Sequence, residues 1–349
     1  MSSHRTEIRL PTRKLGKNGP EVTGIGYGFM GLSVFYGQLK SDDERLALID
    51  HIYASGERNW DTADMYGDSE DLLGKWFKQN PGKREHIFLA TKFANFSDPK
   101  TGERRVRNEP EYIHQAIEKS LARLGVPYVD LYYVHRVNPD SPIETTVGEL
   151  KKLKEAGKIK YIGLSEVSAE TLRRASKIEH IDAVQVEYSA FTVDIEDPKI
   201  DVLRTARELG IATVAYAPLG RGFLAGTIQS RDDLDPSDFR LLMPRFSPEN
   251  FPKNLELVHG IERIARKKGI TAGQLALAWL LAQGDDIIPI PGTTNAKRFD
   301  ENLEALTVNV TKEENDEIRQ LIDNTEVKGG RYPPQMSKWL FGDTKPLDT

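Results

Sequence analysis

Eight short apolar runs recur along the chain, and stretches with helical spacing separate them. The runs lie at residues 22–28, 57–63, 86–92, 129–135, 159–165, 182–188, 211–218 and 286–292. Consecutive strand–helix units favour a parallel sheet, because each helix returns the chain to the edge where the next strand begins. The alternation therefore predicts an α/β protein, a single (β/α)₈ TIM barrel, with a doubly wound open sheet as the alternative fold.

Local signals mark helix ends between these runs. Ser41 and Glu44 form a capping-box pattern, and Gly56 follows as a stop signal. Further helices are expected within 109–125, 168–177 and 201–210. Ahead of the barrel, the Asn18-Gly19 pair predicts an N-terminal β-hairpin.

Three segments rich in Gly, Pro and charge are expected as loops inserted at the C-terminal face of the strands. They lie at 93–108, 219–252 and 326–349. Because no Pro- or Ser-rich linker divides the chain, we expect one domain over residues 1–349. The 326–349 tail is expected to fold over the active-site mouth or to make a subunit contact. Its anchors would be Trp339, Leu340 and Phe341.

Composition excludes several classes of protein. The formal net charge of -5 argues against a nucleic-acid partner, and no stretch approaches the ~20 apolar residues of a membrane span. Residues 1–14 lack the apolar core of a signal peptide. Absence of cysteine removes disulfides, thiolate catalysis and Cys-based metal sites, so no metal site is predicted. A cytoplasmic location is favoured, and the oligomeric state stays open.

Gly26, Gly28 and Gly31 match the glycine spacing of dinucleotide-binding Rossmann proteins. That fingerprint requires a helix to begin within the motif, whereas the first convincing helix here begins near Asp42. We therefore expect the glycines to let the first loop pass close to a ligand.

Four polar residues stand at the ends of apolar runs: Asp61, Tyr66, Lys92 and His135. The carboxyl ends of parallel barrel strands surround the active site, so these side chains are expected to converge. Each alone has an ordinary structural explanation as a helix cap, a loop aromatic, a strand end or a core histidine. A buried ammonium, however, needs a carboxylate partner, which favours pairing of Lys92 with Asp61.

Together the four groups suit the reduction of a carbonyl. A cation beside a phenol lowers the pKa of the phenol, so Lys92 would make Tyr66 a usable proton donor near neutral pH. His135 could donate a hydrogen bond to the same substrate oxygen. None of the four supplies hydride, so a cofactor must do so.

The motifs DTADMYG, ATKF and YYVHR, together with GLSE and AYAPLGRGFLAG, resemble the aldo-keto reductase superfamily. The similarity is especially close to fungal and bacterial members and runs from about Lys14 to Tyr332. It implies that Asp61, Tyr66, Lys92 and His135 are catalytic. It also implies that NADPH binds extended across the barrel mouth and that small-molecule aldehydes or ketones are reduced.

The resemblance also implies cofactor contacts. The implied residues are Gly28, Phe29 and Met30 on the first loop; Ser165 and Gln185 at the nicotinamide carboxamide; Tyr216 stacking on the ring; Pro218, Leu219, Gly220, Arg221 and Gly222 over the pyrophosphate; Gly292, Thr293, Thr294 and Arg298 at the 2′-phosphate; and Glu301 with Asn302 at the adenine. Residues 218–222 could alternatively be a plain turn. Glu166 stands where many relatives have asparagine, and an ionised carboxylate can only accept hydrogen bonds.

Candidate pocket walls are mostly apolar and aromatic, which suits small aryl or alkyl carbonyl compounds. They are Phe29, Met30, Phe35, Tyr36, Phe93, Phe96 and Arg136, although most could equally pack against an inserted loop.

Two rival functions remain open for the same sequence. One is a nucleotide-binding regulatory subunit on the same barrel, like the potassium-channel beta subunits. The other is a Schiff-base barrel enzyme using Lys92, which Asp61 disfavours.

Overall fold

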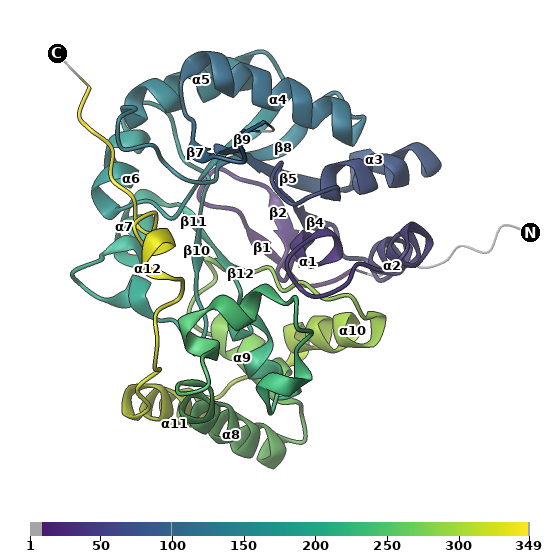
Figure 1. Ribbon diagram of the computed structural model, residues 1–349, viewed down its shortest axis with the longest axis vertical. Coiled ribbons are helices and arrows are strands. Elements are labelled where there is room, and N and C mark those ends of the chain that lie inside the picture. The colour runs from purple at the N-terminus through teal and green to yellow at the C-terminus, as the bar shows by residue number, and fades with distance from the viewer. Residues whose placement is uncertain (1–8, 99, 348–349) are drawn as a thin grey trace, which may run out of the picture.

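The computed structural model of the chain describes residues 9–98 and 100–347. Its main sheet has eight parallel strands, in the order β12-β11-β10-β9-β8-β5-β4-β3, at the centre of the molecule (Figure 1). The strands are β3 (Tyr27–Gly28), β4 (Asn59–Asp61), β5 (Phe88–Phe93), β8 (Val129–Val134), β9 (Ile159–Ser165), β10 (Ala183–Glu187), β11 (Ala212–Tyr216) and β12 (Ile287–Pro289). Apart from the ends of the sheet, each strand therefore lies beside its neighbours in sequence within this sheet, as βαβ units require.

Backbone hydrogen bonds between the first and last segments of this sheet close it into a barrel. The N–H of Gly26 donates to the carbonyl of Pro289 at 2.9 Å, and the N–H of Gly28 donates to that of Pro291 at 3.2 Å. The predicted (β/α)₈ barrel is thus confirmed, and the open-sheet alternative is excluded.

The glycine motif serves this closure. A Cβ atom on Gly26 would lie 2.7 Å from the carbonyl oxygen of Asn59, and one on Gly28 would lie 2.9 Å from that of Ile290. No larger residue fits at either position without moving backbone. The helix that follows, α1 (Met30–Ser33), has only 4 residues, so the Rossmann interpretation is excluded as the sequence indicated.

In the described part of the chain, ten longer helices follow the strands or cap the barrel. Figure 1 shows α3, α4 and α5 along one side and α8 to α11 grouped at the opposite end. Their bounds are α2 (Asp42–Ala54), α3 (Ser69–Gln79), α4 (Pro110–Leu124), α5 (Ile143–Glu155), α6 (Ala169–Ser176), α7 (Val202–Leu209), α8 (Phe251–Lys268), α9 (Ala272–Leu281), α10 (Ala296–Glu304) and α11 (Lys312–Asn324). The capping box of Ser41 with Glu44 is formed, as predicted. Within the described ranges, no helix combines the length and apolar character needed to cross a membrane.

The structure corrects the first strand and adds detail to the insertions. The 22–28 run is not one strand, because its first residues belong to β2 (Glu21–Thr23), which pairs with β1 (Thr12–Lys14) in the predicted hairpin. The chain then turns at Gly24, whose N–H donates a hydrogen bond to the carbonyl of Pro11, before β3 begins.

The 93–108 insertion contains a hairpin that the sequence did not predict, β6 (Asn95–Ser97) with β7 (Arg104–Val106). The 219–252 insertion contains short 3₁₀ helices between Gly220 and Phe246 and ends in the first residues of α8, and the tail contains α12 (Pro334–Ser337).

The hairpin also fills one end of the barrel. Leu15 and Val22 pack in one buried apolar cluster with barrel residues such as Ala183 and Ala212, which stand at the beginnings of their strands. With the amino-terminal ends of the strands covered, the carboxyl-terminal ends are the place for a functional site.

Candidate active site

The four predicted catalytic side chains do converge at the carboxyl ends of the strands. The Lys92 ammonium forms an ion pair with Asp61 and donates a hydrogen bond to the carbonyl of Thr62 at 2.9 Å. Lys92 Nζ lies 5.0 Å from the centroid of the Tyr66 ring. The rings of Tyr66 and His135 meet edge to face with centroids 5.7 Å apart. The predicted pairing of Lys92 with Asp61 is confirmed, and one phenol and one imidazole lie beside it.

The pair is deeply buried: the side chains of Lys92 and Asp61 are 0% and 6% exposed. Burial lowers the pKa of Lys92, and the carboxylate of Asp61 acts against that shift. The second oxygen of Asp61 accepts a hydrogen bond of 2.8 Å from the side-chain amide of Gln185. A charged pair at such a site is stable only because its hydrogen-bonding capacity is satisfied in this way.

One electrostatic prediction is wrong. The pKa of Tyr66 lies well above its usual value, first because the phenol is buried and second because Asp61 is nearby. Burial and the charge of Asp61 outweigh any lowering of this pKa by the nearby Lys92 ammonium, which is itself paired with Asp61. Tyr66 therefore holds its proton at neutral pH.

His135 is neutral in this environment. Burial lowers its pKa well below the usual value, and the positive charges of Arg136 and Lys92 act in the same direction. Its Nδ1 atom is buried and has no hydrogen-bond partner within the described ranges. A neutral imidazole can still donate one hydrogen bond, so it can contact a substrate oxygen without changing the charge of the site.

Sequence reasoning missed the residue that holds the Tyr66 loop. Arg123 of α4 donates hydrogen bonds to the carbonyl of Asp64 at 2.9 Å and to that of Gly67 at 2.6 Å. It therefore binds the loop backbone on both sides of Tyr66. It is itself held by the carboxylate of Glu70 at 2.9 Å. Nothing in the spacing of α4 distinguishes this arginine from a solvent-facing one, which explains the omission.

The residues expected around a nicotinamide lie together on three neighbouring strands. Ser165 ends β9, Gln185 lies in β10 and Tyr216 ends β11. Glu166 follows Ser165, with a left-handed φ of 51°, and its carboxylate accepts a hydrogen bond of 2.7 Å from the hydroxyl of Tyr216. The same carboxylate forms an ion pair with Arg331 of the tail at 3.0 Å. Glu166 therefore serves as a buried structural acceptor, which is a role that asparagine could not fill in the same way.

The predicted pyrophosphate loop is a tight turn after β11. Gly220, Arg221 and Gly222 have φ values of 56°, 58° and 98°, so three successive residues are left-handed. Arg221 is already paired with the buried carboxylate of Glu187 at 3.0 Å. Its guanidinium also lies over the ring of Tyr332, 4.6 Å from the centroid. The loop thus combines the backbone of two glycines with an arginine, Arg221, that already contacts Glu187 and Tyr332.

The region expected to bind the 2′-phosphate is open to solvent. Gly292, Thr294 and Arg298 are exposed, and Asn302 is buried. The α10 helix begins here, with Asn295 as its cap accepting from the N–H of Arg298 at 3.1 Å. The first loop adds a residue that sequence reasoning did not include, because Lys40 donates to the carbonyl of Thr294 at 3.1 Å. Two cations therefore flank a helix amino terminus, an arrangement that favours a phosphate.

Several predicted pocket walls are core residues. Phe29 is 0% exposed and packs against Tyr27 and Trp60, and Phe93 is 0% exposed and stacks on Tyr132. Assigning their side chains to the substrate pocket was wrong: Phe29 directly follows β3 and Phe93 is the last residue of β5, and both rings turn toward the helices. Their aromatic character reflects packing.

The remaining candidate walls are half-buried. These are Met30, Phe35, Tyr36, Phe96 and Arg136. Tyr36 lies under the guanidinium of Arg240, and Phe96 packs edge to face on Tyr112. The pocket is consequently less apolar than the sequence indicated.

The tail crosses the molecule near these residues and is bound at several points. Trp339, Leu340 and Phe341 are all half-buried. Phe341 packs against the core, with the Arg331 guanidinium 4.9 Å from its ring centroid. Beyond them, the N–H of Gly342 donates to the carbonyl of Glu166 at 2.7 Å. Residues 348–349 of the predicted tail lie outside the described residues.

Comparison with known proteins gives the same family throughout. The model of the Aldo/keto reductase family matches residues 24–323. An aldo-keto reductase of Schizosaccharomyces pombe, named with NADP(+), is 52% identical over 97% of this chain and 99% of its own length. Aldo-keto reductase str7 of Strobilurus tenacellus is 49% identical over 92% of this chain and 95% of its own.

Solved structures agree with the fold. A glycerol dehydrogenase from Gluconobacter oxydans matches with a TM-score of 0.78 at 25% identity, over 98% of each chain. A thermostable aldo-keto reductase in complex with the inhibitor epalrestat matches with a TM-score of 0.71 at 27% identity, over 89% of this chain and 100% of its own. This chain belongs to the aldo/keto reductase family.

Proposed function

We propose that this protein reduces aldehydes and ketones to alcohols with NADPH, and that Tyr66 is the general acid. The observation that carries the proposal is the buried Lys92–Asp61 pair with Tyr66 and His135 beside it at the barrel mouth. The NADP(+) in the name of the 52% identical relative supports the choice of cofactor.

Each residue has a role that follows from its surroundings. The raised pKa keeps Tyr66 protonated at neutral pH, so a proton is available when negative charge develops on the substrate oxygen. Lys92 favours the phenolate that remains, and Asp61 keeps Lys92 in place. Neutral His135 donates a second hydrogen bond to the same oxygen and so orients the carbonyl. NADPH, when bound, supplies the hydride.

The residues present fit such a cofactor. Ser165 and Tyr216 lie on strands beside the catalytic groups, where a carboxamide and a ring could be held. Arg298 and Lys40 flank the amino terminus of α10, where a 2′-phosphate would meet two cations and the helix dipole. We assign the remaining predicted contacts to the same groove. We also propose that residues 1–349 act as one barrel domain in the cytoplasm, with the tail over the mouth.

The test is NADPH absorbance decay with a panel of aldehydes and ketones. Replacing Tyr66 with Phe should reduce kcat by at least two orders of magnitude. Tyr53→Phe is the matched control, since Tyr53 lies on α2 in the outer layer. Retained turnover in Tyr66→Phe would remove Tyr66 from the role of acid. Tight NADPH binding without turnover of any carbonyl compound would instead favour the regulatory-subunit alternative.

The cofactor assignment has its own test. Arg298→Ala should raise the KM for NADPH far more than the KM for NADH, because only NADPH carries the 2′-phosphate. The neighbouring Lys297→Ala is the control, since the Lys297 side chain is 86% exposed and faces Glu301. Equal changes for the two cofactors in Arg298→Ala would refute the assignment.

A further inference from the structure

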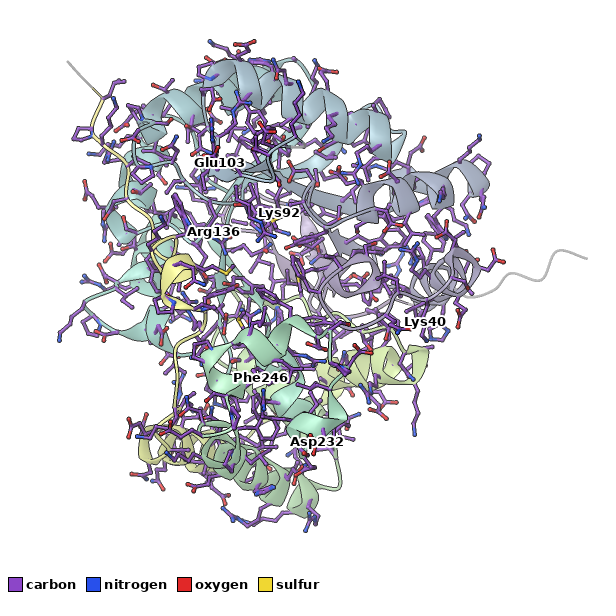
Figure 2. All side chains as sticks on the ribbon, in the orientation of Figure 1. Lys40, Lys92, Glu103, Arg136, Asp232 and Phe246 are labelled. Atoms are coloured by element: carbon purple, nitrogen blue, oxygen red, sulfur yellow. The ribbon has the colours of Figure 1, made fainter. Side chains whose placement is uncertain are left out.

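Arg136 lies in the proposed site, and it takes part in no ion pair among the residues that the structure describes. It directly follows His135 and β8, and Figure 2 shows it near Lys92 in the middle of the molecule. Its Nη1 atom donates to the carbonyl of His135 at 2.6 Å and to the hydroxyl of Ser165 at 3.3 Å. Within residues 9–98 and 100–347, no ion pair of Arg136 within 4.0 Å occurs.

Two buried carboxylates in this part of the barrel are paired with other arginines. Both oxygens of Glu166 bind Arg331, at 3.1 and 3.0 Å. Glu187 binds Arg221 at 3.0 Å and Arg245 at 3.3 Å. Neither of these carboxylates forms an ion pair with Arg136 in the described residues, so no direct ion pair balances the charge of its guanidinium.

An uncompensated guanidinium at such a place is costly unless a ligand meets it. Arg136 is half-buried, so it has lost part of its hydration and keeps part of its surface accessible to solvent. Its hydrogen bonds to the carbonyl of His135 and the hydroxyl of Ser165 hold the guanidinium beside the groups proposed to meet the substrate and the nicotinamide. A guanidinium fork matches a carboxylate better than any neutral group.

We propose that Arg136 anchors the substrate through a carboxylate, so that the preferred substrates are aldehydes and ketones that also carry a carboxylate near the carbonyl. This inference rests on the proposed function and deepens it. In the reaction, hydride joins the carbonyl carbon, the carbonyl π electrons pass to oxygen, and that oxygen takes the Tyr66 proton. The carboxylate stays anionic throughout and only positions the molecule.

The loss of two aromatic walls supports this choice of substrate. Phe29 and Phe93 face the core, so the pocket keeps less apolar surface for a purely aryl or alkyl compound. Arg136 is the residue in the remaining set of walls that carries a charge.

The test compares matched pairs of substrates. The pairs are 3- and 4-carboxybenzaldehyde against their methyl esters, which differ in charge but share the reacting carbonyl. For the protein as it stands, kcat/KM should be at least tenfold higher for an acid than for its ester. Arg136→Met should lower kcat/KM at least tenfold for the acid and less than about twofold for the ester, and Arg136→Lys should restore part of the acid activity.

Controls separate this role from a structural or cofactor role. Arg105→Met, at an exposed arginine in β7, should leave both values unchanged. The KM for NADPH should stay within about twofold in Arg136→Met. An equal fall for acid and ester, or no preference in the starting protein, would overturn the inference while leaving carbonyl reduction intact. No turnover of either member of any pair would overturn the proposed function as well.

Discussion

Arg331 donates hydrogen bonds from its two terminal nitrogens to the two carboxylate oxygens of Glu166, at 3.1 and 3.0 Å. The side chains are only 4% and 0% exposed. Glu166 immediately follows the last residue of β9, whereas Arg331 lies in the C-terminal tail. The pair therefore ties the tail to the strand end beside Ser165, and breaking it leaves a charge buried without its partner.

Removing both partners should cost less than the two single losses added together. Arg331→Met and Glu166→Gln should each lower the free energy of unfolding by about 3–5 kcal/mol, the range for a broken buried ion pair. The double variant should lose clearly less than the sum, because neither charge is then stranded. Urea denaturation of the four proteins gives the coupling energy, and strict additivity would show that the pair contributes no specific interaction.

Closure of the barrel depends on a glycine that tolerates no side chain. Gly26→Ala should destabilise the protein by about 1–3 kcal/mol, because its Cβ would lie 2.7 Å from the carbonyl oxygen of Asn59. Gly148 is the matched control: it lies in α5, and a Cβ there would meet nothing within 4 Å. Gly148→Ala should stabilise the helix by about 0.5–1 kcal/mol. Thermal or urea unfolding measures the stability change in both variants. If Gly148→Ala destabilises the protein as much as Gly26→Ala does, the steric explanation is wrong.

Arg123 is predicted to act through the position of Tyr66. Arg123→Met should lower kcat by about tenfold or more while leaving the KM for NADPH nearly unchanged, because the loop that carries Tyr66 loses its two carbonyl contacts. Arg204→Met is the control, since Arg204 pairs with Asp201 at the surface with its side chain 70% exposed. Arg123→Lys should recover part of the activity. Parallel losses in kcat and in cofactor binding would indicate general unfolding of the site instead.

Asp64 should make stability depend on pH in an unusual direction. Burial, with Glu70 nearby, raises the pKa of Asp64 from 3.8 to about 8. The folded chain keeps this proton up to about pH 8, but the unfolded chain loses it near pH 4. The stabilising contribution is therefore present at pH 4 and declines as the pH rises to about 8, by about 1.4 kcal/mol per unit of pKa difference.

Asp64→Asn removes this titration. The variant should gain stability relative to the starting protein as the pH increases from 4 to 8, and the difference should level off above pH 8. Urea midpoints across that range give the curve, and carboxyl NMR of Asp64 gives its pKa. A stability difference that does not vary with pH would mean that the carboxyl titrates normally.

Much of the barrel was predictable because apolar runs and helix caps are local signals. The capping box of Ser41 and the order of the strands follow from residues close in sequence. The convergence of the proposed catalytic quartet was predictable for a related reason, since Asp61 and Lys92 lie in the last two residues of their strands and Tyr66 and His135 come after strands. By contrast, the extent of β3 was misjudged, because Val22 and Tyr27 look alike in sequence although a turn at Gly24 separates the hairpin from the barrel.

Contacts between distant segments could not be read in this way. The pairing of Arg331 with Glu166 joins residues 165 positions apart, and the contacts of Arg123 with Asp64 and Gly67 span 59 and 56 positions. The error at Phe29 has the same cause. Its position directly after a strand was predicted correctly, but packing against the distant Trp60 determines where its ring points. Similarly, the pKa of Tyr66 depends on how deeply the phenol is buried, a quantity that only the folded arrangement fixes.

The most direct test of the central claim is a single-turnover reaction with NADPH that carries deuterium at both positions of the nicotinamide C4. For the protein as it stands, mass spectrometry should find deuterium on the carbinol carbon of the alcohol, formed in step with the loss of NADPH absorbance. Tyr66→Phe should bind the labelled cofactor and form almost no alcohol over the same time. Labelled alcohol formed by Tyr66→Phe at an undiminished rate, or alcohol without the label from the starting protein, would contradict proton donation by Tyr66 to a carbonyl that receives hydride from NADPH.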